Sequence, residues 1–113
     1  MPMMIGFAQH RLALLQQELE KIVEMLPQLG IKRCTLLNPL YPGIVERDTS
    51  LKLVMIMDDD RPFVRRPDFF YSHLSPRVAV DFLCYTPEEM MTIQKGNSYL
   101  SKAIRGGEII YGE

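Results

Sequence analysis

Three polar side chains interrupt two apolar segments of the chain. Ser50 and Lys52 lie at the start of SLKLVMIM, residues 50–57. Asp81 lies within RVAVDFLCY, residues 77–85. Because residues two apart in a β-strand point to the same face, Ser50 and Lys52 are predicted to present a hydroxyl and an ammonium at one spot. Neither group is a carboxylate, so this spot is not suited to hold a divalent metal ion.

Other residues with reactive or charged groups have simpler explanations. The consecutive acids at 58–60 have side chains that fan out instead of converging, so we interpret them as a solvated turn rather than a metal site. His10 and His73 have no Cys, His or acidic neighbour at ligand spacing, which favours ordinary surface residues. The arginines of segment 61–66 could contact a phosphate or an acidic partner, but a solvated loop is the preferred interpretation.

A helix is predicted to begin near residue 7. Apolar residues recur there at spacings of three and four, with Gln, Glu and Lys between them, which indicates an amphipathic helix that faces a core. Pro27 and Gly30 are expected to end it. The recurring apolar residues are Leu12, Leu15, Leu19, Ile22 and Leu26.

The rest of the chain alternates between predicted strands and helices. Strands are predicted at 31–37, 50–57, 77–85 and, at a sheet edge, 108–112, and helices at 67–74 and on both sides of Gly96. The second strand is apolar on both faces in its later half, which predicts a place in the middle of the sheet. This order predicts a single domain over 1–113 of the α/β (α+β) class, with helices packed on a small mixed sheet in two layers.

The segment Thr86-Pro87-Glu88-Glu89 predicts the start of a helix. Thr86 can cap the helix, and Pro87 suits its first position. Glu89 stands three residues after Thr86, which completes a capping box.

The composition is that of an ordinary globular protein, with 47% hydrophobic residues, 24% charged residues and a net charge of −1. This balance gives no reason to expect binding to nucleic acid or to an anionic membrane. Cys34 and Cys84 lie far apart without C-x-x-C spacing, so both are predicted to be reduced and buried. No apolar run reaches the roughly 18 residues of a membrane span, and the start lacks the plan of a signal peptide, so the expected location is the cytoplasm.

The second half of the chain resembles a known family. VDFLCYTPEEM at 80–90 and IIYGE at 109–113 match the later motifs of minimal nucleotidyltransferases. These are small stand-alone relatives of the DNA polymerase beta superfamily, often encoded next to a HEPN-domain partner. From about residue 8 to the end, the order of predicted elements is similar to that of the family, and the resemblance implies a nucleotidyltransferase-like fold.

The first half keeps the spacing of the family but not its catalytic residues. The resemblance places the Gly-Ser pair of the phosphate-binding loop on Asn38 and Pro39, and the two strand aspartates on Ser50 and Lys52. Asp81 retains the third acidic position. The remaining positions of the pattern fall on Leu40, Pro42, Gly43 and Thr49.

These replacements predict a protein without nucleotidyltransferase activity. Lys52 adds positive charge where the family holds metal ions, so metal binding should be lost or badly weakened. Pro39 has no N–H, and Asn38 carries a side chain where glycine permits close approach of a phosphate. A salt bridge between Lys52 and Asp81 is predicted across the former metal site, and a simply exposed Lys52 is the second interpretation.

The predicted function is therefore binding. The resemblance implies a HEPN-type partner in a toxin–antitoxin-like setting, a homodimer is the other expected partner, and no cofactor is expected. The first alternative is an active enzyme that uses Mg²⁺ and a nucleoside triphosphate, which requires carboxylates from 58–60, Glu46 or Asp48 to converge near Asp81. The second alternative is a metal-independent nucleotide sensor in which Lys52 holds a phosphate.

Overall fold

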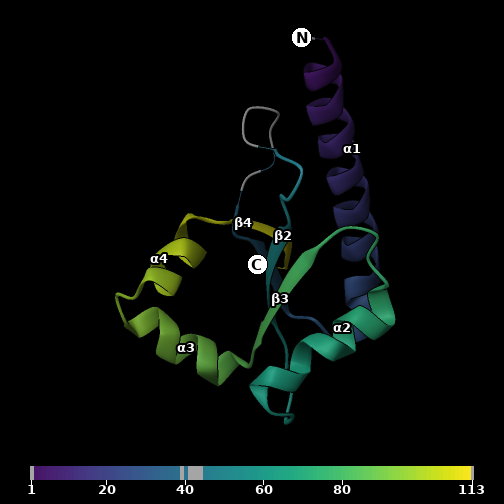
Figure 1. Cartoon of the computed structure of the whole chain (residues 1–113). Coiled ribbons are helices and arrows are strands. Elements are labelled where there is room, and N and C mark those ends of the chain that lie inside the picture. The colour runs from purple at the N-terminus through teal and green to yellow at the C-terminus, as the bar shows by residue number, and fades with distance from the viewer. Residues whose placement is uncertain (1, 39, 41–44, 113) are drawn as a thin grey trace.

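The computed structural model describes residues 2–38, 40 and 45–112, which form a four-stranded mixed sheet with helices packed on it (Figure 1). This architecture confirms the predicted α+β class. The strands are β1 (Arg33–Leu36), β2 (Leu51–Ile56), β3 (Val80–Tyr85) and β4 (Glu108–Gly112). The helices are α1 (Pro2–Met25), α2 (Arg66–Leu74), α3 (Pro87–Lys95) and α4 (Tyr99–Gly106), with short 3-10 helices η1 (Leu26–Leu29) and η2 (Phe63–Arg65).

The strand order in the sheet is β3-β2-β1-β4. β2 pairs in parallel with β3 and antiparallel with β1, while β4 pairs antiparallel with β1. The apolar β2 therefore lies inside the sheet, and the C-terminal β4 lies at one edge, as the sequence predicts. The parallel pairing of β2 with β3 matters for the site, because it aligns the starts of the two strands.

The larger core lies between the sheet and the helices α1 and α2. Leu51, Leu53 and Met55 of β2 are buried there, in keeping with the period of two along a strand. From α1, Leu15 and Ile22 are buried against them. The predicted amphipathic face of the first helix is thereby confirmed.

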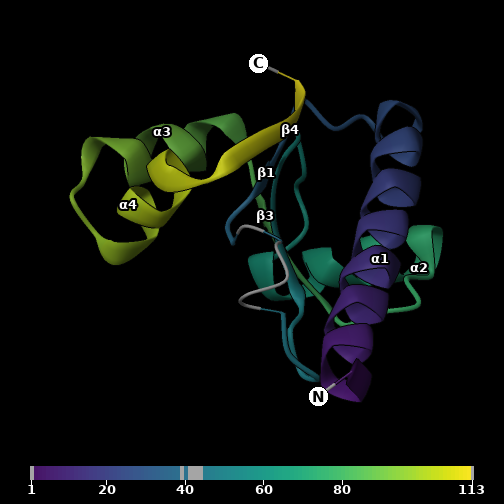
Figure 2. The same ribbon diagram turned by 90° about the horizontal axis from the view of Figure 1, so that it is seen from above.

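A smaller core covers the opposite face of the sheet. Val54 and Ile56 of β2 pack there with Met90 of α3 and Ile104 of α4. Figure 2 shows α1 and α2 on one side of the sheet and α3 and α4 on the other. The molecule therefore has three layers, and the two-layer prediction is wrong because the helices after β3 bury an apolar face of their own.

The first helix is longer than predicted. It begins at Pro2, and proline suits the first helical position because its φ is already helical. It ends at Met25 and runs into η1, after which Gly30 adopts the left-handed conformation with φ of 76°. Pro27 and Gly30 thus end the helical segment where the sequence places its end.

The predicted capping box of α3 is confirmed. The Thr86 hydroxyl accepts a hydrogen bond from the Glu89 N–H at 3.2 Å, and the Glu89 carboxylate accepts one from the Thr86 N–H at 2.9 Å. The next helix, α4, has a cap that the sequence analysis did not predict. The Ser98 hydroxyl accepts a hydrogen bond from the Ser101 N–H at 3.1 Å. The Thr86 cap marks the end of β3 and the start of α3, and the Ser98 cap marks the start of α4.

Both cysteines are free and buried, as predicted. Burial raises the pKa of the Cys34 thiol to about 12 and that of Cys84 to about 11, so both stay protonated and unreactive at neutral pH. Within the described residues, no helix combines the length and the apolar character needed to cross a membrane.

Candidate functional site

Ser50, Lys52 and Asp81 come together at the start of two neighbouring strands. Lys52 is paired in register with Asp81 across the parallel β2–β3 ladder. The Ser50 hydroxyl donates a hydrogen bond to the Asp81 carboxylate, with Oγ 3.4 Å from Oδ2. Because Ser50 and Lys52 are two residues apart, both project toward the face of the sheet that carries Asp81.

This spot is open because the covering helices stop short of it. Lys52 and Asp81 lie on the sheet face that α3 and α4 cover, yet both side chains are exposed. The apolar residues packed beneath those helices come two positions later on each strand, Val54 on β2 and Leu83 on β3. The polar pair Lys52 and Asp81 is therefore exposed to water, whereas the apolar pair Val54 and Leu83 packs against α3 and α4.

The predicted salt bridge between Lys52 and Asp81 is wrong. No ion pair of the described residues joins these two side chains. The prediction assumed that an aspartate in so apolar a strand needs a counter-ion. Asp81 needs none, because its carboxylate is solvated, and the exposed Lys52 of the second interpretation is what the structure has.

A groove of about 410 Å³ borders the site. It is lined by Lys52, Pro67, Tyr71, Asp81, Phe82 and Leu83. The Tyr71 hydroxyl, which comes from α2, donates a hydrogen bond to the backbone carbonyl of Val80 at the edge of β3. Burial, and to a smaller degree the charge of Asp81, raises the pKa of the Tyr71 phenol. No sequence spacing reveals this role of Tyr71, because the contact joins a helix to the edge of a later strand.

Asn38 lies beside the same strand start. Its side-chain amide donates a hydrogen bond to the Ser50 carbonyl oxygen at 3.2 Å, and the neighbouring Leu37 N–H donates to the Lys52 carbonyl at 2.9 Å. Pro39, together with Pro42 and Gly43, lies outside the described residues. Across residues 37, 38, 40 and 45–50 the connection from β1 to β2 has turns and bends and no helix whose N-terminus could face a phosphate.

The described residues hold no cluster of three or more His, Cys, Asp or Glu side chains suited to a metal ion. An active enzyme would require carboxylates to converge near Asp81, and no group of three includes Asp81 among the described residues. Asp58 instead forms an ion pair with Lys32 at 3.2 Å, and Asp59 forms one with Arg61 at 2.6 Å. His10 and His73 are exposed, as predicted.

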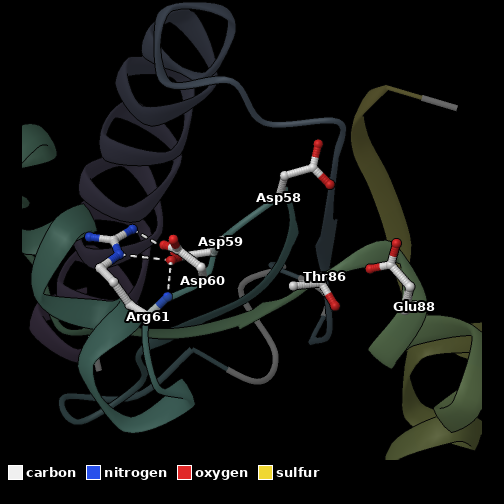
Figure 3. Close-up of a pocket in the computed structure, with 6 residues that line it drawn as sticks. All are labelled: Asp58, Asp59, Asp60, Arg61, Thr86 and Glu88. Carbon is white, nitrogen blue, oxygen red and sulfur yellow. Dashed lines mark hydrogen bonds and ion pairs between the residues drawn. The ribbon is translucent and has the colours of Figure 1, made fainter.

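The acids at 58–60 border a pocket of about 570 Å³ with the start of α3 (Figure 3). Asp59 is almost fully buried, with 1% of its side chain exposed, and accepts two hydrogen bonds from the Arg61 guanidinium at 2.8 and 2.6 Å. These hydrogen bonds lower the pKa of the Asp59 carboxyl and raise the pKa of Arg61. The solvated-turn prediction holds for the exposed Asp58 and Asp60 and fails for Asp59.

Arg66 is also buried, which overturns the solvated-loop prediction for it. Its guanidinium binds the Glu89 carboxylate at 2.5 and 3.2 Å and donates to the backbone carbonyls of Arg61 and Cys84. The hydrogen bonds with Glu89 raise the pKa of Arg66 and are the main cause of the lowered pKa of Glu89. Of the three arginines in segment 61–66, Arg65 is the exposed one.

The Asp59–Arg61 pair predicts how stability changes with pH. A carboxyl whose pKa is depressed on folding contributes stability that is complete above its unfolded value of about 3.9 and is lost as the pH falls through the folded value. We expect Asp59→Asn to lower the free energy of unfolding by about 2 kcal/mol at pH 7 and to flatten its decline below pH 5. Urea unfolding at pH 7, 5 and 3 measures both effects. Asp60 is exposed, so Asp60→Asn is the matched control. If the free energy of unfolding fell equally with pH in the two variants, this account would be contradicted.

Comparisons with models of protein families, with curated proteins and with solved structures find no match to this chain.

Proposed function

We propose that the chain is a nucleotidyltransferase-like domain that has lost catalysis and acts by binding a protein. The observation that supports this most is the meeting of Ser50, Lys52 and Asp81 at one open spot on the β2–β3 face. In the family that the chain resembles, three aspartates occupy these positions. A hydroxyl, an ammonium and one carboxylate occupy them here.

The chemistry of this set supports the loss of catalysis. Two-metal phosphoryl transfer needs carboxylates that bridge ions about 4 Å apart. Asp81 supplies one carboxylate, and the ammonium of Lys52 opposes any cation bound beside it. Asn38 carries a side chain at the position of the loop glycine, and its amide donates a hydrogen bond to the Ser50 carbonyl.

Binding is the function that remains for such a scaffold. The resemblance suggests a HEPN-type protein as the partner in an antitoxin-like pair, and a second copy of the chain is the other candidate. In either case the inactive site would serve as framework, and the contact surface would lie elsewhere on the domain.

A metal-independent nucleotide sensor is the second candidate, and one observation favours it. Lys52 has no ion-pair partner in the described structure and lines the groove that Tyr71 borders, so its ammonium is available to a phosphate. The carboxylate of Asp81 lines the same groove and would repel that phosphate. This opposition makes nucleotide binding the weaker proposal.

Calorimetric titration with ATP and GTP, once with Mg²⁺ and once with EDTA, separates the candidates. We expect no binding in either buffer at a Kd below about 1 mM, because the described residues hold no cluster suited to a metal ion and Pro39 has no N–H to offer a phosphate. Binding that needs Mg²⁺ and disappears in Asp81→Ala would contradict the proposal and indicate an active enzyme. Binding that survives EDTA and disappears in Lys52→Ala would indicate the sensor.

A further inference from the structure

An apolar groove opens between η2 and α3, away from the β2–β3 site. It has a volume of about 410 Å³ and is lined by Phe63, Tyr85, Glu89, Thr92 and Ile93. The rings of Phe63 and Tyr85 stack with their centroids 5.1 Å apart and form an aromatic wall. Glu89 is already satisfied by Arg66, so the groove offers an occupant mainly apolar surface.

The loop that precedes η2 and the first turn of α3 carry acidic groups. The pocket shown in Figure 3 lies between the loop at 58–61 and the residues Thr86 and Glu88 at the start of α3. The charge of Asp59 is balanced by Arg61, and Asp58 has Lys32 as its counter-ion. Asp60 and Glu88 are exposed and belong to none of the ion pairs of the described residues. An occupant that suits both parts would combine an apolar anchor with positive charges.

The outer face of α4 has this combination. The inner face of the helix buries Ser101 and Ile104. On the outer face lie Tyr99, which is 89% exposed and the most exposed large hydrophobic residue of the described chain, and the exposed Lys102 and Arg105. Residues three apart on a helix are neighbours, so the aromatic ring and the cations form one continuous surface.

We propose that the groove between η2 and α3 receives the α4 face of a second copy of this chain. Tyr99 of one copy would enter the aromatic groove of the other, and Lys102 and Arg105 would meet Asp60 and Glu88. The two surfaces match in two properties. The aromatic ring suits the apolar wall of the groove, and the cations of α4 suit the carboxylates that have no ion-pair partner among the described residues. This inference names the partner in the proposed function. It rests on the proposal that the chain acts by binding a protein, and not on the proposed loss of catalysis.

The contact is small, so the association is expected to be reversible and concentration-dependent. One aromatic anchor inserted in a pocket carries most of the affinity of such an interface, while the surrounding charges set orientation and salt sensitivity. Raising the ionic strength should weaken the association, because exposed charges are screened.

Sedimentation equilibrium of the full chain over rising concentrations tests this inference. We expect self-association of the wild type that Tyr99→Ser weakens about tenfold or more. Met91→Ser is the matched control, because Met91 is 58% exposed on α3 and does not line the groove. A wild type that stays monomeric up to about 1 mM would overturn the proposal, as would equal effects of the two substitutions.

A charge exchange identifies the two surfaces that meet. One variant carries Asp60→Lys with Glu88→Lys, and the other carries Lys102→Glu with Arg105→Glu. Each variant alone should be monomeric, because its groove and its α4 face then repel each other, whereas a mixture of the two should associate. Circular dichroism checks that both are folded. Association of either variant alone at the strength of the wild type would overturn the proposal, and the nucleotide titration would be unaffected by that outcome.

Discussion

Replacing Arg66 by alanine is expected to lower the free energy of unfolding by about 3 kcal/mol. The side chain is 6% exposed, and its guanidinium holds the Glu89 carboxylate and the carbonyl oxygens of Arg61 and Cys84. Removing it leaves the buried Cys84 carbonyl without this donor and opens a cavity where the stem was packed. Glu89 is 42% exposed and can turn to water, so the loss should fall at the lower end of the range for broken buried pairs.

The neighbouring Arg65 provides the control for this measurement. Arg65 is exposed, so Arg65→Ala should change stability by less than about 0.5 kcal/mol. Arg66→Lys keeps the charge but lacks the planar fork that reaches several acceptors at once, so an intermediate loss is expected. Urea unfolding at pH 7 measures all three variants, and equal stabilities for Arg65→Ala and Arg66→Ala would show that the buried contacts contribute nothing net.

The Arg66–Glu89 pair also connects the two layers of helices. Arg66 begins α2, and Glu89 lies in the first turn of α3. Glu89 additionally completes the capping box with Thr86 and lines the apolar groove. Loss of Arg66 should therefore loosen the groove wall as well as the fold, and Arg66→Ala should reduce self-association together with stability.

Local signals in the sequence predicted the elements well. The capping box at Thr86 and Glu89 lies within four consecutive residues, so its geometry depends on no other part of the chain. The interior place of β2 followed from apolar residues on both faces, which only an enclosed strand can bury.

Contacts between distant segments were the part that the sequence concealed. Arg66 meets Glu89 across 23 positions of the chain, and no periodicity relates the two residues. The prediction of a salt bridge between Lys52 and Asp81 was wrong for a related reason. An apolar run suggests that every side chain in a strand is enclosed, whereas the helix layer on that face covers only the later half of β2 and β3.

Aspartates at positions 50 and 52, where the resemblance places those of the family, should create a metal site. In a variant with Ser50→Asp and Lys52→Asp, the formal charge of positions 50, 52 and 81 changes from zero (0, +1 and −1) to −3. The Ser50 Oγ is 3.4 Å from the Asp81 carboxylate, and residue 52 is the register partner of Asp81, so the new oxygens would converge with the old ones. We expect the variant to bind Mn²⁺ with a Kd of about 1 mM or tighter, and the wild type to show no comparable binding.

The stability of the same variant gives an independent readout. Three close carboxylates repel one another, so the metal-free variant should have a lower Tm than the wild type. Mn²⁺ at about 100 times its Kd should raise the free energy of unfolding of the variant by about 2.7 kcal/mol. Ser50→Asn with Lys52→Asn is the matched control, since it keeps the side-chain shapes without the charges. Adding Asp81→Asn to the aspartate variant should abolish the gain. If the aspartate variant folds but does not bind Mn²⁺, positions 50, 52 and 81 do not correspond to a former metal site. The proposal that the chain is a nucleotidyltransferase-like domain without catalysis would then lose its main support.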